Sequence, residues 1–362
     1  MTWLILQLLV WIGAALASAL FTRCYRAMAP QWELWDKPQS EHHKNHTRPT
    51  AVVGGFAMWS AWIVLLLAGL LVACVGQNLL PLDLQAALTG IPSAAKSLLV
   101  IILGATALAI MGLCDDKHAM KASRKFLVQF LVAVLTAVFG PRVLVGIVPV
   151  WLSWFLTAFW IALVINAMNF FDNMNGLTAG VSLIAFAFLF SIAVMRGQYF
   201  VGLLTALGGG VALGFLFFNY PNATGFMGDC GSHFLGYLLA ITCIITTFYH
   251  HENTPSYLAL AIPLMVLAVP LLDAATVVLI RLKLHKPIYV GDNRHLSHRF
   301  VQVGLSRALS VAAIWLLSLL AGFGALALIW LPPLGALLIL TQLVVMVALI
   351  LLIQLGSHPP EN

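Results

Sequence analysis

The sequence predicts an all-α polytopic membrane protein with about eleven transmembrane helices. Of its 362 residues, 62% are hydrophobic and only 8% are charged, whereas a soluble domain carries about 25% charged residues. Apolar runs close to the ~20 residues that a helix needs to cross a bilayer also recur along the whole chain. No soluble segment or internal repeat interrupts them, so we expect residues 1–362 to form one integral membrane domain.

The expected spans are separated by short polar connections. They cover Trp3–Phe21, Ala51–Val75, Ser97–Leu113, Phe126–Phe139, Ile147–Met168, Leu177–Met195, Phe200–Phe218, His233–Phe248, Tyr257–Ile280, Ala308–Leu331 and Leu334–Leu355. The fourth is the shortest, and it ends before Gly140-Pro141, a pair that stops helices.

The basic residues predict the orientation of the spans. With eleven crossings, all but Lys96, Arg142 and Arg196 of the 18 Lys and Arg residues fall on the side of the C-terminus. Because positively charged loops stay in the cytoplasm, we expect the C-terminus inside and the N-terminus outside. The net charge of +6 is then explained by these loops, and nucleic-acid binding is not expected.

The acidic residues gather on the same side, although no charge rule requires it. Asp115, Asp116, Asp172, Asp229 and Asp292 lie in or beside the predicted cytoplasmic connections. Ionisable groups at the ends of apolar helices are hypotheses for functional sites. The adjacent carboxylates of Asp115 and Asp116 repel each other and favour a cation, for which Mg²⁺ with substrate phosphates is a suitable candidate.

Amide side chains accompany these acids. Asn169, Asp172 and Asn175 lie within the turn sequence NFFDNMNG, and Asn166 precedes it inside an apolar helix. Amides and a carboxylate suit ribose hydroxyls, a pyrimidine edge or a hydrated Mg²⁺. Turn formation explains part of this composition equally well. The segment FMGDCGSHFLG presents the same choice, since Asp229 is either an ordinary N-cap or part of a phosphate–metal site at a helix N-terminus.

Basic residues in three connections suit phosphate binding. The first connection is equally consistent with a positive-inside loop and with a phosphate pocket. In the last connection an anion site is favoured over zinc, because His-x-x-His lacks a third ligand nearby. The candidate anion-binding residues are Lys37, His46, Lys121, Lys125, Arg294, His295, His298 and Arg299.

Together these motifs resemble the polyprenyl-phosphate N-acetylhexosamine-1-phosphate transferases, which belong to glycosyltransferase family 4. The resemblance runs from the first connection to Arg307. Its motifs are Asp36-Lys37-Pro38 with His46 and Gly54-Gly55, then Asp115-Asp116, Asn166 with Asn169-Phe-Phe-Asp172, Phe226-Met-Gly-Asp229, and His295-Leu-Ser-His298. Each is weak alone, but their order, spacing and common side are specific together.

The resemblance implies a fold of ten or eleven helices in a bacterial inner membrane, with the active site on its cytoplasmic face. It also implies transfer of N-acetylhexosamine-1-phosphate from a UDP-sugar, most simply UDP-N-acetylglucosamine, to undecaprenyl phosphate, with release of UMP. Mg²⁺ is the expected cofactor, and Mn²⁺ is the expected substitute.

The resemblance also assigns roles to residues. Asp229 and Asp172 become metal ligands, and Asp115, Asp116 and Asp172 become catalytic residues, with Asp115 as the base. The basic residues given above, with Asn166, Asn169 and Asn175, become substrate-binding residues. A homodimer is compatible with the resemblance.

Departures from the family pattern in two motifs point to a modified donor site. The family usually has Asp where this chain has Asn175, and Gly where it has Asn173. Ser297 stands at the middle position of the family's His-x-His-His motif, which shifts weight to Arg294 and Arg299. An inactive relative is the alternative within the family.

A secondary transporter for an anionic metabolite is the main alternative outside the family. Transporters place polar sites near the bilayer midplane on interrupted helices, and Pro263 and Pro270 do interrupt the ninth span. The acids, however, lie at one end of the predicted spans, which favours an interfacial enzyme.

Overall fold

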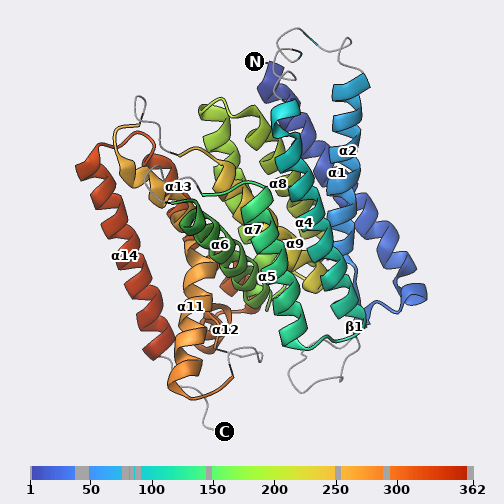
Figure 1. Ribbon diagram of the computed structural model, residues 1–362. Helices are drawn as coiled ribbons and strands as arrows, with labels where there is room; N and C mark the ends of the chain where they lie inside the picture. The colour runs from blue at the N-terminus through green and yellow to red at the C-terminus, as the bar shows by residue number, and fades with distance from the viewer. Residues whose placement is uncertain are drawn as a thin grey trace.

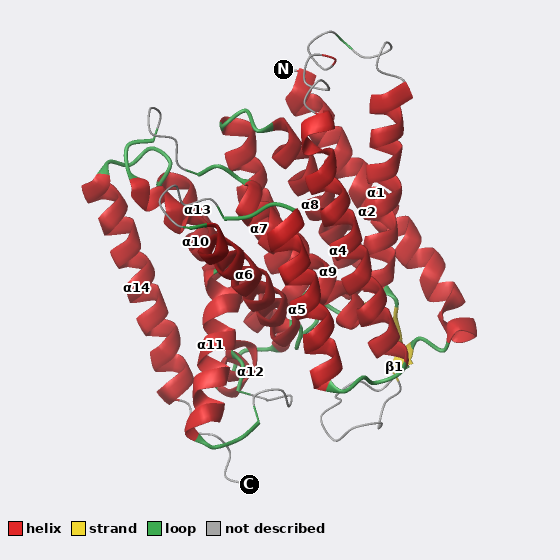
Figure 2. Ribbon diagram, viewed as in Figure 1, coloured by secondary structure: helices red, strands yellow, loops and turns green. Residues whose placement is uncertain are grey.

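The computed structural model describes residues 2–36, 49–75, 81, 85, 91–143, 149–248, 254–287 and 294–356. These form a bundle of long helices (Figures 1 and 2). In the described residues, ten helices are long and apolar enough to cross a membrane, or eleven if one bent pair is counted as a span. The predicted all-α polytopic fold is therefore confirmed.

The long helices are α1 (Thr2–Trp32), α2 (Gly54–Val75), α4 (Ile91–Lys117), α5 (Ala122–Phe139), α6 (Val150–Phe171), α7 (Leu177–Met195), α8 (Tyr199–Asn219), α9 (Gly228–Ile245), α13 (Arg307–Ala327) and α14 (Pro333–Gly356). The bent pair consists of a 3₁₀ turn (Tyr257–Ala261) and α10 (Ile262–Val266), followed by α11 (Ala268–Lys283). A short helix, α12 (Leu296–Gln302), precedes α13.

The start of α1 and the end of α14 lie at opposite ends of the bundle (Figure 1). An odd number of crossings requires this arrangement, so it agrees with the eleven predicted spans. Which end faces the cytoplasm remains a prediction from the basic loops.

Several helices extend further than the hydropathy predicts, as α1 does to Trp32 and α5 does from Ala122. Two of these extensions, in α4 and α9, change the setting of the acids. The predicted third span ends at Leu113, but α4 continues to Lys117 and includes the acid pair. The predicted eighth span begins at His233, but α9 begins at Gly228 and holds Asp229 in its first turn. Polar residues at a span end lower the hydropathy without breaking the helix, so hydropathy alone sets these boundaries too short.

The predicted ninth span is broken. Its two halves, Tyr257–Val266 and Ala268–Lys283, meet at an angle of 68°. Pro270 has no N–H to donate to the carbonyl of Val266, and its ring crowds that carbonyl. This explains why α10 ends at Val266 and a new helix begins two residues later.

Three very short strands form a sheet that the hydropathy pattern does not predict. β2 (Thr50–Val52) pairs antiparallel with β1 (Trp35–Asp36) and parallel with β3 (Gly225–Phe226). The register places Val52 beside Phe226. The sheet therefore fixes the entry to α2 against the entry to α9, three residues before Asp229.

Helix α9 lies at the centre of the bundle and is packed by α2, α4, α6, α7 and α8. Its Phe234 is fully buried and meets the equally buried Trp62 of α2 edge to face. In contrast, only 11% of the residues in the apolar stretch of α14 are buried inside the protein. The central helix is thus held on all sides, and its N-terminal turn is the structural centre of the site.

Candidate active site

Glycines allow three backbone segments to meet at the first turn of α9. A Cβ on Gly55 of α2 would lie 2.1 Å from the backbone nitrogen of Gly231, and one on Gly112 of α4 would lie 2.3 Å from that of Cys230. Gly228 has φ = +71°, a conformation that favours glycine. The close approach brings the end of α4, with its acid pair, against the start of α9.

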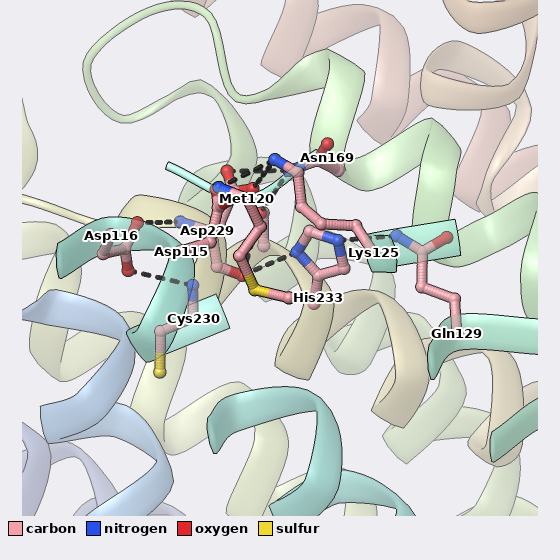
Figure 3. Close-up of polar contacts among 10 residues, drawn as sticks. Asp115, Asp116, Met120, Lys125, Gln129, Asn169, Asp229, Cys230 and His233 are labelled. Atoms are coloured by element: carbon pink, nitrogen blue, oxygen red, sulfur yellow. Dashed lines mark hydrogen bonds and ion pairs between the residues drawn. The ribbon is translucent and has the colours of Figure 1, made fainter. Parts of the chain in front are cut away.

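Asp116 caps the N-terminus of α9 from a different helix. Its Oδ1 accepts the N–H of Asp229 at 2.7 Å, and its Oδ2 accepts the N–H of Cys230 at 3.1 Å (Figure 3). These N–H groups belong to the first turn of α9, where no intrahelical acceptor exists. Met227, at the N-cap position, provides no side-chain bond. Both carboxylate oxygens of Asp116 therefore hold the turn that carries Asp229.

Lys125 of α5 joins the other carboxylate of the acid pair to Asp229. Its Nζ lies 2.8 Å from Asp115 Oδ2 and 2.7 Å from Asp229 Oδ2 (Figure 3). The second oxygen of Asp115 accepts the N–H of Met120 at 2.7 Å. One ammonium group thus occupies the position between two carboxylates that come from α4 and α9.

Asn169 completes this cluster from the last turn of α6. Its Nδ2 donates to Asp229 Oδ1 at 3.1 Å and to Ser232 Oγ at 3.0 Å. We call Asp115, Lys125, Asn169 and Asp229 the Asp229 cluster. All four were predicted site residues, and the structure brings them together from four helices.

Asp172 lies directly after α6 and is half-buried. Burial raises the pKa of its carboxyl to about 7, and the negative charge of Asp229 acts in the same direction. A carboxyl in this environment gains from a nearby cation that favours its charged form.

A second group of predicted residues surrounds Asp273 of α11. This carboxylate is 1% exposed; its Oδ2 lies 2.7 Å from His295 Nδ1, and its Oδ1 accepts the N–H of Leu296 at 2.6 Å. His295 is also buried, and its ring centroid lies 6.5 Å from that of His298. Asp273 therefore orients His295 and fixes the start of α12.

The two groups are connected through the turn after α6. Ser297 Oγ of α12 donates to Asn173 Oδ1 at 2.5 Å, and Asn173 Nδ2 donates to the carbonyl of Phe170 at 3.2 Å. Ser297 and Asn173 are both positions for which the resemblance implies a different residue. The structure shows that these two residues contact each other.

Other predicted residues lie outside these groups. Asn175 and Lys121 are exposed, whereas Arg299 is 4% exposed and bonds Gln302. Arg294 is half-buried at the start of the segment that leads into α12. Lys37, His46 and Asp292 lie outside the described residues.

Three polar residues in this region were not predicted as part of the site. Gln129 and His233 lie one helical turn from Lys125 and Asp229, and Asp273 anchors His295. The available signal was their position: each lies within an apolar span, where a polar side chain is energetically costly. Asn166 donates to Gln129 Oε1 and to the carbonyl of Ala162, both at 2.8 Å, and its role in substrate binding stays a prediction.

The carboxylate oxygens of the Asp229 cluster fit part of a Mg²⁺ ligand shell, which waters and substrate phosphates would complete. Among the described residues, no group of three or more His, Cys, Asp or Glu side chains forms a protein-only metal site. Mg²⁺ usually keeps waters and binds one or two carboxylates together with substrate phosphates. The Lys125 ammonium between Asp115 and Asp229 shows that these two oxygens already favour a cation.

Comparison with known proteins places this site in a family. The model of glycosyl transferase family 4 matches residues 98–247, which include the whole Asp229 cluster. The chain is 32% identical over 243 residues to a probable undecaprenyl-phosphate N-acetylglucosaminyl 1-phosphate transferase of Bacillus subtilis, covering 64% of this chain and 67% of that protein.

Two further relatives carry similar names. A decaprenyl-phosphate N-acetylglucosaminephosphotransferase of Mycobacterium tuberculosis is 30% identical over 80% of this chain and 74% of its own length. An undecaprenyl-phosphate alpha-N-acetylglucosaminyl 1-phosphate transferase of Escherichia coli is 26% identical over 61% and 63%. On the family match and these identities, the chain belongs to glycosyl transferase family 4.

Proposed function

We propose that the protein transfers N-acetylhexosamine-1-phosphate from a UDP-sugar, most simply UDP-N-acetylglucosamine, to undecaprenyl phosphate and releases UMP. The observation that carries this proposal is the Asp229 cluster, in which the Lys125 ammonium bridges the carboxylates of Asp115 and Asp229 at one end of the helix bundle. The names of the relatives support the lipid acceptor and the sugar. The reaction would take place at the cytoplasmic face of a bacterial inner membrane.

In this proposal an oxygen of the lipid phosphate attacks the phosphorus that carries the sugar. The bond from that phosphorus to the UMP oxygen breaks, and UMP leaves with the electron pair. The lipid phosphate is already largely ionised near pH 7, since the second pKa of a phosphate is about 6. A strong base is therefore unnecessary, and Asp115 serves mainly to hold Lys125.

Phosphoryl transfer depends on positioning and on neutralising negative charge. Asp229 and Asp172 would hold Mg²⁺, with Mn²⁺ as a substitute, and the ion would neutralise the donor diphosphate. Lys125 supplies a second positive charge next to Asp115 and Asp229. His295, oriented by Asp273, and the basic residues near α12 would contact the remaining phosphate oxygens.

The placement of the polar residues also favours an enzyme over a transporter. The Asp229 cluster is built from the last turns of α4 and α6 and the first turns of α5 and α9. A transporter would place such a cluster near the bilayer midplane. The broken span α10–α11 carries Asp273, but this residue is bonded to α12.

The test is to incubate purified protein with Mg²⁺, undecaprenyl phosphate and a panel of UDP-sugars, and to measure UMP. We expect UMP release that requires both the lipid and one N-acetylhexosamine donor. A folded preparation, judged by its thermal unfolding, that releases no UMP with any sugar contradicts the proposal. A burst of UMP without lipid, with a trapped phospho-enzyme, would replace direct attack by a two-step route.

A further inference from the structure

A second polar layer lies directly beneath the Asp229 cluster. Gln129 follows Lys125 by four residues on α5, and His233 follows Asp229 by four residues on α9. Asn166 precedes Asn169 by three residues on α6. Each step leads from the helix end that carries the site toward the middle of the helix, over about 4.5–6 Å at ~1.5 Å per residue.

The three residues of this layer form one continuous hydrogen-bonded chain. Asn166 Nδ2 donates to Gln129 Oε1 at 2.8 Å, and Gln129 Nε2 lies 2.7 Å from His233 Nε2. His233 Nδ1 lies 2.7 Å from the carbonyl oxygen of Asp229 (Figure 3). His233 is fully buried and Gln129 is 3% exposed, so protein groups must satisfy both side chains.

The carbonyl oxygens at the two ends of the chain, those of Asp229 and Ala162, fix the direction of every bond in it. A carbonyl oxygen only accepts, so His233 Nδ1 carries a proton and donates it to Asp229. An amide nitrogen only donates, so His233 Nε2 carries a lone pair and accepts from Gln129. The imidazole is therefore neutral, in the Nδ1–H tautomer, and Gln129 presents its oxygen to Asn166.

Such a chain supplies what apolar packing cannot. In a bilayer, apolar contacts give little preference for one axial position of a helix over another, whereas interhelical hydrogen bonds are directional. Thr242 of the same helix donates to the carbonyls of Leu238 and Leu239, both within α9. The chain through His233 instead joins α5, α6 and α9, which are the helices that carry Lys125, Asn169 and Asp229.

We propose that His233, with Gln129 and Asn166, is a positioning residue that holds Lys125, Asn169 and Asp229 in register for phosphoryl transfer. This inference rests on the proposed function. His233 touches no substrate; it acts through the backbone of Asp229 and through the two neighbouring helices. Loss of the chain should therefore lower kcat and leave the KM values for lipid and UDP-sugar almost unchanged.

The kinetic test compares His233→Leu, Gln129→Leu and the double variant with Thr242→Val, a buried control on α9. Each single variant leaves a buried partner unsatisfied and should lower the unfolding temperature. The double variant removes both groups of the Gln129–His233 bond and should recover part of this loss, while Asn166 keeps its bond to the carbonyl of Ala162. We expect kcat per folded molecule to fall at least tenfold in all three, with KM within threefold of the parent, and to stay unchanged in Thr242→Val.

A purely structural layer predicts a different pattern, in which the double variant recovers turnover together with stability. That result contradicts the inference, provided that the parent protein releases UMP. A parent protein without activity instead contradicts the proposed function. If the leucine variants do not fold, Gln129→Met, which is close to glutamine in size, carries the same kinetic test.

A spectroscopic test is independent of turnover. In protein with ¹⁵N-labelled histidine, the signal that disappears in a His233 variant should show a protonated Nδ1 and an unprotonated Nε2. The Nε2 signal should shift in Gln129→Met, because its hydrogen-bond donor is removed. A protonated Nε2, or a signal indifferent to Gln129, contradicts the chain itself.

Discussion

Ser297 and Asn173 share a 2.5 Å hydrogen bond that joins α12 to the turn after α6. The resemblance to the family implies a different residue at each position, and the two positions come into contact only in the folded chain. The bond connects the segment of His295 and His298 to the segment of Asn169 and Asp172. It therefore fixes two walls of the proposed donor site relative to each other.

This relationship predicts coupled effects on donor binding. We expect Ser297→Ala and Asn173→Ala each to raise the KM for the UDP-sugar several-fold, because a hydrogen bond contributes about 0.5–1.5 kcal/mol. The double variant should be no worse than Asn173→Ala, which already lacks the bond to Ser297 and the bond to the carbonyl of Phe170. Initial rates at varied donor concentration measure this, and additive effects would show that the two residues act separately.

Removing the charge of Asp229 should abolish turnover without unfolding the protein. Asp229→Asn loses the carboxylate that pairs with Lys125 and that would neutralise the metal, so we expect at least ~100-fold slower UMP release. The unfolding temperature should change by only a few degrees. Activity close to that of the parent would remove Asp229 from the site.

Lys125 should compete with a divalent cation for the same carboxylate oxygens. In Lys125→Met, Asp115 and Asp229 lose their ammonium partner, so without substrates the variant should bind Mn²⁺ more tightly than the parent while turnover falls. Electron paramagnetic resonance of free Mn²⁺ measures the affinity. Lys125→Arg, which keeps the charge, is the control, and weaker Mn²⁺ binding by the methionine variant would contradict the competition.

Asp116 should contribute to stability as well as to activity. In Asp116→Asn, one carboxylate oxygen becomes an NH₂ group facing a backbone N–H of α9. A buried donor without its acceptor costs about 1–3 kcal/mol. We expect a clear decrease in unfolding temperature, absent in a Cys114→Ser variant of the exposed neighbour. An unchanged unfolding temperature with lost turnover would instead assign Asp116 a purely catalytic role.

The close contact between α2 and α9 should not tolerate a methyl group. In Gly55→Ala the new Cβ would lie 2.1 Å from the backbone nitrogen of Gly231, so a helix must move. We expect poor folding or lost turnover. Gly69→Ala on the same helix is the matched control, because nothing lies within 4 Å of its Cβ, and equal behaviour of the two variants would contradict the contact.

The sequence predicted the number of helices well because lipid imposes a simple requirement on composition. A span must be apolar over about 20 residues, so α7 was predicted at its observed bounds, Leu177–Met195. The positions of the Asp229 cluster were also predictable, since a charged group at the end of an apolar span is costly and therefore informative.

The partners of these residues were decided by the tertiary structure alone. Sequence placed Asp115 and Asp116 together as one acid pair, yet the two carboxylates point to different partners: Asp116 caps α9, and Asp115 holds Lys125. Nothing in the local sequence distinguishes them, because the partners lie on α9 and α5. The roles of Gln129 and His233 were equally unpredictable, because the sequence does not show which residue of another helix faces a single polar residue in a span.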